Sequence, residues 1–126
     1  MKQKVHSVSY LAKAEFEFKN GVYDLVALPA GAEVVKVSLE VGSNVIDGDI
    51  SVGFKDEPKK DYFLTLERVV SLGDEHGIVT STSAKDYTAT SNKVVVAEVK
   101  NRSNLSAVKC ALRVVYFLPS VIEIEY

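Results

Sequence analysis

The chain has 126 residues, a length that suits one domain, and its 47% hydrophobic and 25% charged residues are typical of a globular rather than a disordered protein. Its formal net charge of −2 argues against a surface that binds nucleic acid or a membrane. No apolar run approaches the ~20 residues of a membrane helix, and the N-terminal residues lack the apolar stretch of a signal peptide. We therefore expect cytoplasmic synthesis. Cys110 is the single cysteine and is interpreted as a small buried hydrophobe rather than a reactive thiol.

Short alternating segments begin near the N-terminus. Residues 4–10 are typical of an edge strand, and we treat residues 1–12 as an N-terminal arm or edge strand of a single domain that spans residues 1–126. In residues 14–19 phenylalanine alternates with glutamate. The Asn20-Gly21 dipeptide that follows is a strong signal for a tight hairpin, and it predicts pairing with a strand over residues 22–28.

The middle of the chain predicts further strands. Residues 33–41 alternate cleanly, which places Val35, Val37, Leu39 and Val41 toward the core. Residues 49–54 predict a shorter strand. Residues 62–72 fit both a strand and one helical face, and we interpret them as strand or irregular structure that can include a helical turn. Residues 78–83 predict a weakly paired strand, and residues 81–91 an exposed connection.

The most strongly patterned stretch is residues 92–118. Its first run has apolar residues on both faces, which is typical of a strand covered on both sides. In its second run one face carries the apolar set Val108, Cys110, Leu112, Val114 and Tyr116. The polar sequence NRSNLS lies between the two runs and predicts a hairpin connection. Pro119-Ser120 ends the second run, and residues 121–126 predict a terminal strand.

Eight or so short strands with regularly spaced turn signals, and no convincing long helix, indicate an all-β fold. We predict an antiparallel β-sandwich of about eight strands that resembles a jelly roll.

Few residues suggest chemistry. His76 follows Asp74 and Glu75, but neighbours in sequence rarely converge on one metal ion, and zinc sites need spaced cysteine and histidine ligands. Asp47-Gly48-Asp49 offers carboxylate oxygens for calcium, although the EF-hand spacing is absent and Asp-Gly is a common turn pair. Asp47 and Asp49 are therefore the only metal candidates. We expect no catalytic residues and no cofactor, because no nucleophile elbow or phosphate-binding loop is present.

Tyrosine is the one residue type whose placement suggests contacts with another molecule. Tyrosine is favoured at interfaces because it combines apolar area with a polar tip. The candidate interface residues are Tyr10, Tyr62, Tyr87 and Tyr126. Tyr62 and Tyr87 fall in or beside expected loops, where contacts with sugar or protein are reasonable, but they also fit a role in capping the edges of the core. The two chain ends are rich in strand formers and suit pairing with another subunit.

The run from Tyr23 to Phe63 resembles small structural proteins of tailed phages and prophages. Leu28-Pro29-Ala30-Gly31-Ala32 leads into an apolar strand, and Ile50-Ser51-Val52-Gly53-Phe54 is followed by Asp56. The closing aromatic strand, Val108 to Leu118, is similar too. The resemblance implies a non-enzymatic virion component, such as a head-decoration, capsid-associated or fibre-linked protein. It also implies symmetric multimers on the particle, and it carries over no catalytic residue.

The leading hypothesis is therefore a virion structural protein that is synthesised in the cytoplasm and then incorporated into the particle. Its expected partners are its own copies, as a trimer or larger, and other virion proteins. The rival is a carbohydrate- or receptor-binding module that uses loop tyrosines and a concave face. A third possibility, an enzyme, requires a pocket with convergent titratable groups.

Overall fold

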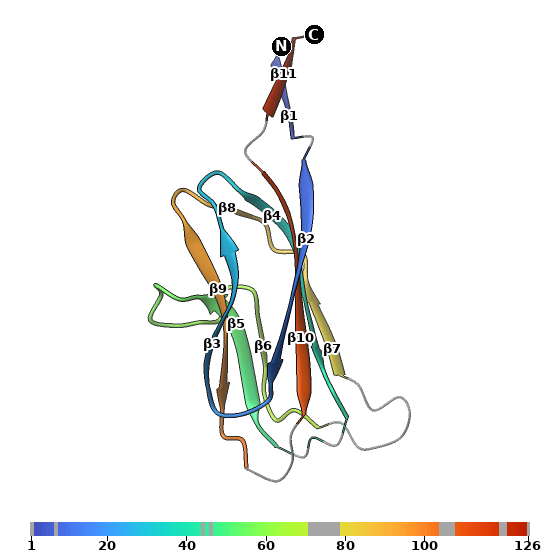
Figure 1. Ribbon diagram of the computed structural model, residues 1–126, viewed down its shortest axis with the longest axis vertical. Helices are drawn as coiled ribbons and strands as arrows, with labels where there is room; N and C mark the ends of the chain where they lie inside the picture. The colour runs from blue at the N-terminus through green and yellow to red at the C-terminus, as the bar shows by residue number, and fades with distance from the viewer. Residues whose placement is uncertain are drawn as a thin grey trace.

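The computed structural model describes residues 2–6, 8–43, 45, 47–70, 79–103, 108–118 and 121–125, and every regular element within these ranges is a β-strand (Figure 1). The strands are β1 (Lys2–His6), β2 (Ser9–Glu17), β3 (Gly21–Leu28), β4 (Glu33–Val41), β5 (Asp49–Phe54), β6 (Leu64–Leu66), β7 (Val79–Ser83), β8 (Tyr87–Thr88), β9 (Lys93–Lys100), β10 (Lys109–Phe117) and β11 (Val121–Glu125). No helix in the described residues is long and apolar enough to cross a membrane.

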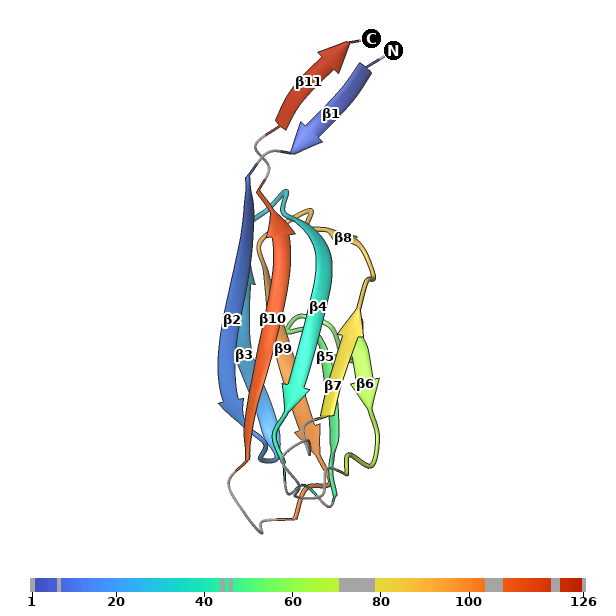
Figure 2. The same cartoon turned by 90° about the vertical axis from the view of Figure 1, so that its right-hand side faces the viewer.

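Two antiparallel sheets form a sandwich. One sheet has the strand order β2-β10-β4-β7, with β8 paired to β4, and the other has the order β3-β9-β5-β6. The two sheets lie face to face (Figures 1 and 2). The predicted all-β, antiparallel sandwich is confirmed, with nine strands in its two sheets rather than about eight.

The strand pairing is nested in the manner of a jelly roll. β2 pairs with β10, β3 with β9, β4 with β7 and β5 with β6, as if one long hairpin had been rolled up. β1 and β11 pair with each other outside both sheets and are the free end of this hairpin. Residues 2–6 of the expected N-terminal arm thus form β1, while residues 9–12 begin β2, the edge strand of its sheet.

The two hairpins predicted from turn signals are wrong. β2 and β3, joined through Asn20-Gly21, belong to different sheets, and so do β9 and β10. In each case the chain reverses, but the returning strand packs across the sandwich instead of pairing alongside. Phe16 of β2 and Tyr23 of β3 illustrate this, because their rings lie 5.3 Å apart between the sheets. Turn residues specify the reversal, whereas the apolar faces of both strands decide whether they pair or pack.

The core lies between the sheets and is almost entirely aliphatic and aromatic. The apolar face predicted for residues 108–116 is confirmed, since Val108, Cys110, Leu112 and Val114 are buried and Tyr116 is half-buried. The prediction that β9 is covered on both sides is confirmed at Val96, which is fully buried although it lies outside the main core cluster. Each large apolar side chain that is fully buried contributes about 1.5–3 kcal/mol.

A β-bulge corrects the predicted face of β4. The register with β10 shifts between Val115 and Tyr116, so that Val115 lies opposite Lys36 and Tyr116 opposite Val34. Val35 is the extra residue, and it is 39% exposed, whereas Val34 is buried. A bulge adds one residue to one strand and breaks the alternation of two, which a pattern read from one strand alone cannot reveal. The inward positions Val37, Leu39 and Val41 were predicted correctly.

Two other segments are more ordered than the sequence indicates. Residues 81–91 were expected to be an exposed connection, but Ser81–Ser83 belong to β7 and Tyr87 begins β8, and both strands pair with β4. The strand predicted over residues 78–83 is present from Val79. Residues 62–70 combine the short β6 with irregular backbone, in line with the interpretation, and residues 71–72 lie outside the described residues.

Cys110 gives a first testable prediction. Its side chain is buried in β10, and burial raises the pKa of its thiol to about 12. Because the thiolate is the reactive form, we expect a thiol-specific reagent at neutral pH to label Cys110 only after the protein is unfolded in urea. Rapid labelling of the native protein would contradict both the burial and the raised pKa.

Candidate assembly surfaces

The terminal ribbon, defined as β1 and β11, stands clear of the sandwich (Figures 1 and 2). Its register places Lys2 opposite Glu125, Lys4 opposite Glu123 and Val5 opposite Ile122. Opposite charges at directly facing positions stabilise an antiparallel pair by about 0.2–1 kcal/mol each. Both chain ends therefore meet in one structure at one end of the molecule.

The ribbon extends the β2–β10 ladder with one interruption. The Leu118 N–H donates to the Val8 carbonyl oxygen at 2.8 Å, which bridges the two ladders. The last pair of the sandwich ladder is Ser9–Phe117 and the first pair of the ribbon is His6–Val121. His6 is three residues from Ser9, whereas Val121 is four residues from Phe117. The register of the ribbon thus differs by one residue from that of the β2–β10 ladder.

Apolar side chains are exposed close to the base of the ribbon, and we call Leu11, Val35 and Val115 the shoulder patch. Leu11 in β2 is 61% exposed and lies opposite the half-buried Val115 of β10, while Val35 sits at the bulge on the other side of β10. Tyr10, one of the predicted interface residues, is 50% exposed and stacks on its cross-strand partner Tyr116 at 5.8 Å. This end of the five-stranded sheet presents apolar area that none of the described residues covers.

Tyr62 and Tyr87 lie together, but their rings are engaged in packing. Phe54 is the centre of the cluster, with its ring 4.5 Å from that of Tyr87 and 5.3 Å from that of Tyr62. The Tyr62 hydroxyl donates to the Asp86 carbonyl oxygen at 3.0 Å, and Lys85 Nζ lies 4.0 Å from the Tyr62 ring centre. Both tyrosines are half-buried at the edge of the core, an arrangement that does not favour open stacking on a sugar.

Gly53 explains why this cluster can form beside β5. A Cβ atom at Gly53 would lie 2.6 Å from both the Asp61 nitrogen and the Lys60 carbonyl carbon. The backbone of the loop after β5 therefore rests directly on the strand, which brings Tyr62 and Phe63 back against Phe54. Only glycine leaves room for this approach.

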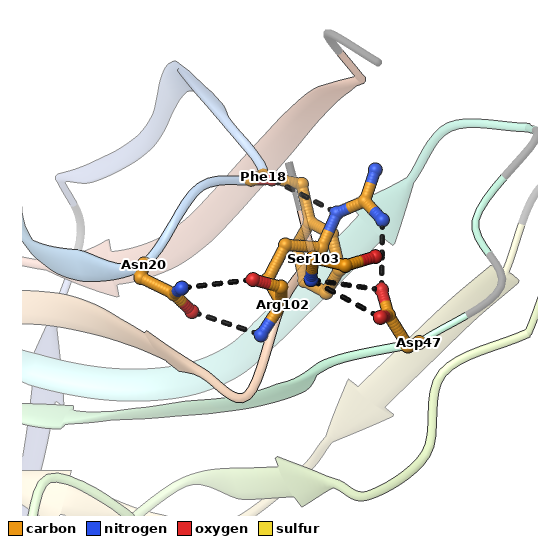
Figure 3. Close-up of polar contacts among 5 residues, drawn as sticks. All are labelled: Phe18, Asn20, Asp47, Arg102 and Ser103. Carbon is orange, nitrogen blue, oxygen red and sulfur yellow. Dashed lines mark hydrogen bonds and ion pairs between the residues drawn. The ribbon is translucent and has the colours of Figure 1, made fainter. Parts of the chain in front are cut away.

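At the opposite end of the sandwich, three loops are joined by Arg102 (Figure 3). Its side chain is only 1% exposed, and its Nη1 donates to Asp47 Oδ1 at 2.9 Å while its Nε donates to the Phe18 carbonyl oxygen at 3.3 Å. Asn20 joins the backbone of Arg102 through two hydrogen bonds of 2.9 Å, one accepted by Asn20 Oδ1 and one donated by its Nδ2. A buried charge needs such partners, and here they also connect the loops that follow β2, β4 and β9.

The two predicted metal candidates bind protein donors instead of meeting at one point. Asp47 accepts from Arg102 and from the Ser103 N–H, at 3.1 and 3.2 Å to its two oxygens. Asp49 accepts from the Arg68 N–H at 2.9 Å and from Asn101 Nδ2 at 2.7 Å, and thereby holds two residues of left-handed backbone. Within the described part of the chain, no three histidine, cysteine or acidic side chains gather as metal ligands would.

Gly48 accounts for the Asp-Gly-Asp sequence without a metal. Its φ is +114°, and a Cβ atom there would lie 2.8 Å from the ring of Phe18. Glycine is therefore required both for the backbone conformation and for contact with the core. The acidic residues on either side of Gly48 connect this turn by hydrogen bonds to the segments that follow β6 and β9.

The hydrogen bonds to these carboxylates predict a pH dependence of stability. Hydrogen bonds from Ser103, which in the structure come from its N–H, and then from the Arg102 guanidinium hold the pKa of Asp47 below its usual value. The Arg68 N–H and Asn101 lower the pKa of Asp49, and Lys93 lowers that of Asp56. A lowered pKa means that the folded protein favours the charged carboxylate.

These carboxylates contribute stability above their unfolded pKa of about 3.9, and the contribution is lost as the pH falls through their lower folded pKa values. We expect the free energy of unfolding in urea to change little on acidification until about pH 4, and then to fall. Asp47→Asn should be less stable than the wild type at neutral pH, and its free energy of unfolding should fall less than that of the wild type below about pH 4. A decline that begins near neutral pH would contradict this assignment.

Some candidate residues lie outside the part of the chain that the structure describes. Tyr126, the fourth predicted interface residue, lies outside the described residues, as do His76 with its acidic neighbours, Pro119-Ser120 and the second half of the NRSNLS connection. Asn20 and Arg102 are the important residues that sequence reasoning missed. The only signal for Arg102 was a charged residue beside a turn, which is also what a solvated residue looks like.

Comparison with solved structures decides the family. The chain is 67% identical, over 100% of both chains and with a TM-score of 0.87, to a chain of the acidic stable capsid structure of Helicobacter pylori bacteriophage KHP30. The chain belongs to this family of phage capsid proteins. A chain of the capsid asymmetric unit of cyanophage Pam1 shares 19% identity over 88% of this capsid protein and 85% of that chain, with a TM-score of 0.63, which shows a common fold. No protein-family model and no curated protein matches the sequence.

The family assignment makes this capsid protein a non-enzymatic component of the virion, and it confirms the resemblance seen in the sequence. The functional surfaces of a capsid protein are those that contact other capsid subunits. In the described part of this one, the terminal ribbon lies outside both sheets, and three exposed large apolar side chains, Tyr10, Leu11 and Val35, lie near its base, with Val22 and Val70 exposed elsewhere.

Proposed function

We propose that this capsid protein is a decoration or capsid-associated subunit that assembles as a symmetric multimer, a trimer or larger, on the particle. The observation that carries the proposal is the terminal ribbon outside both sheets, next to the shoulder patch.

A ribbon of two strands is marginally stable by itself in water. The strands of this ribbon also contain the apolar residues Val5, Ile122 and Ile124. Apolar residues stabilise a protein only when they are removed from water. A neighbouring subunit in the assembly can supply that cover. When all subunits are the same chain, closed rotational symmetry lets each one satisfy its neighbour in the same way.

The physical state of a related capsid suggests a further property of the subunit. The capsid of phage KHP30 is described as acidic stable. We propose that this chain too tolerates mild acid, down to about pH 4, below which the carboxylates of Asp47, Asp49 and Asp56 lose their stabilising contribution. Among the described residues, Arg102 is the only charged or polar one that is buried. A guanidinium keeps its charge throughout acid pH, and no described carboxylate has to be neutralised inside the core.

The oligomeric state of the purified protein, measured by size-exclusion chromatography with light scattering, tests the multimer. We expect a trimer or larger for the full chain. A variant that lacks residues 1–6 and 121–126 should be a monomer with the circular dichroism of a folded sandwich. A full chain that remains a monomer at high concentration would contradict the proposal.

Particles assembled without this chain test the decoration role. We expect closed shells to form in its absence and to bind the added protein until a fixed number of sites is filled, as measured by sedimentation. If no shell forms when the chain is omitted, the decoration role is wrong and the chain builds the shell itself.

A further inference from the structure

We propose that the ribbons of neighbouring copies pair edge to edge, with β1 of one copy against β11 of the next, and close into a small barrel around the symmetry axis of the multimer. This inference rests on the proposed symmetric assembly and names the contact that holds it together. Three features of the ribbon support it: its open edges, the charge of each strand and the placement of its apolar residues.

The ribbon has two open edges. In the described residues β1 pairs with β11 and with no other strand, and β11 likewise pairs with β1 only. The outer side of each strand is therefore a row of backbone N–H and C=O groups available for another strand. A neighbouring copy on each side can form backbone hydrogen bonds with both rows, and a closed ring of copies has no unpaired strand edge.

The two edges differ in charge. The sequence of β1, KQKVH, is basic through Lys2 and Lys4, whereas that of β11, VIEIE, is acidic through Glu123 and Glu125. Contact between β1 and the β11 of a neighbour brings opposite charges together, while contact between two β1 strands or two β11 strands brings like charges together. The charges thus favour a head-to-tail contact over a two-fold one. Head-to-tail contacts generate rings when the rotation closes.

Strand direction agrees with this choice. β1 and β11 are antiparallel within one copy. Copies related by an axis along the ribbon all have β1 running in the same direction, so β1 of one copy is antiparallel to β11 of the next. The resulting barrel is antiparallel throughout, and three ribbons of two strands would supply about six strands, near the size of the smallest barrels.

Three of the four apolar positions of the ribbon lie on one face. In register, Val5 is opposite Ile122 and Gln3 is opposite Ile124, whereas the charged pairs Lys2–Glu125 and Lys4–Glu123 occupy the intervening positions. Residues two apart share a face of a strand, so Val5, Ile122 and Ile124 lie on one face of the ribbon, whereas Val121, opposite His6, lies on the charged face. Closing the ribbons into a barrel places that face inside and leaves the charged face in solvent.

Disulfide trapping between two different single-cysteine variants tests the contact. Lys4→Cys and Glu123→Cys are each produced in the full chain, mixed in denaturant, refolded together and oxidised. Cys110 does not compete, because its thiol is buried. We expect disulfide-linked dimers in the mixture and almost none in either variant alone. The register between the two copies is tested by the other three mixtures of a β1 variant, Lys2→Cys or Lys4→Cys, with a β11 variant, Glu123→Cys or Glu125→Cys.

A matched control uses Lys59→Cys, an exposed lysine in the loop after β5, mixed with Glu123→Cys; this mixture should remain uncrosslinked. Light scattering on the same samples distinguishes failure of the edge pairing between ribbons from failure of the symmetric multimer. A multimer in which none of the four ribbon combinations crosslinks would overturn edge pairing and leave the symmetric assembly intact. Monomers would overturn both, and strong crosslinking of Lys4→Cys with itself would replace the ring by a two-fold contact.

Charge reversal provides an independent measurement. Lys2→Glu with Lys4→Glu, or Glu123→Lys with Glu125→Lys, should convert the multimer to monomers at low salt. The variant with all four changes restores opposite charges within and between ribbons, and it should recover the multimer. If the four-fold variant stays monomeric while its sandwich is folded, the charge argument for edge pairing is wrong.

Discussion

Replacing Arg102 with methionine is expected to lower the free energy of unfolding by about 3 kcal/mol, the lower end of the range for breaking a buried ion pair. Methionine fills much of the space of the side chain but donates no hydrogen bond. The Phe18 carbonyl oxygen loses its donor, and Asp47 loses its ion pair of 2.9 Å. Asp47 is 36% exposed and can regain water on one side, which keeps the loss from being larger. Urea unfolding at neutral pH measures the change.

Arg113→Met is the matched control. Arg113 also forms an ion pair with a carboxylate, at 3.1 Å to Glu40 Oε2, but it is half-buried on the outer face of the sheet. Ion pairs that remain in contact with water contribute about 0–1 kcal/mol. Equal losses for the two variants would show that burial of the Arg102 guanidinium does not govern its contribution.

Gly53→Ala is expected to destabilise the protein by about 3 kcal/mol, at the upper end for overpacking. The new methyl group would meet the backbone at Lys60 and Asp61 rather than the flexible end of a side chain. The loop must move away from β5, and the packing of Tyr62 on Phe54 moves with it. Besides urea unfolding, the near-ultraviolet circular dichroism of the tyrosines should therefore change.

Ser51→Ala is the control for that substitution, because Ser51 lies two residues earlier in β5 and is not fully buried. Its effect should stay within about 0.5 kcal/mol, as for most exposed changes. A stable Gly53→Ala variant with the tyrosine signal of the wild type would contradict the close approach of the loop to β5.

The alternation of apolar and polar residues was enough to predict the fold class and most strands. In β10 the buried face from Cys110 to Val114 follows the sequence pattern directly, because a period of two has only one way to face a single core. β5 is similar, with Ile50, Val52 and Phe54 buried as predicted. The pattern is local, and the structure of such a strand is local too.

Strand pairing could not be predicted in the same way. Asn20-Gly21 and the connection after Asn101 both indicated hairpins, yet each joins strands of different sheets. In a jelly roll the partner of β2 is β10, which lies almost a whole chain length away. A turn residue cannot specify a strand pairing over that distance. The sequence pattern of β4 alone also does not reveal the bulge that exposes Val35.

The candidate assembly surfaces were partly visible in the sequence. The chain ends were expected to be available for pairing, and the structure pairs them with each other in the terminal ribbon. Tyr10 is exposed beside that ribbon, whereas Tyr62 and Tyr87 pack on Phe54. The role of Arg102 depends on loops that follow β2, β4 and β9, and only their meeting in space makes its burial possible.

The central place of β10 has a consequence for how the subunit is made. β10 lies between β2 and β4, and it is the last strand of the sandwich to be synthesised. Until it leaves the ribosome, β2 has no neighbour in its sheet and one side of the interior stays open to water. A nascent chain that stops before residue 109 therefore cannot mature, and subunits should enter particle assembly only as finished chains, after a slow step dominated by contacts between distant residues.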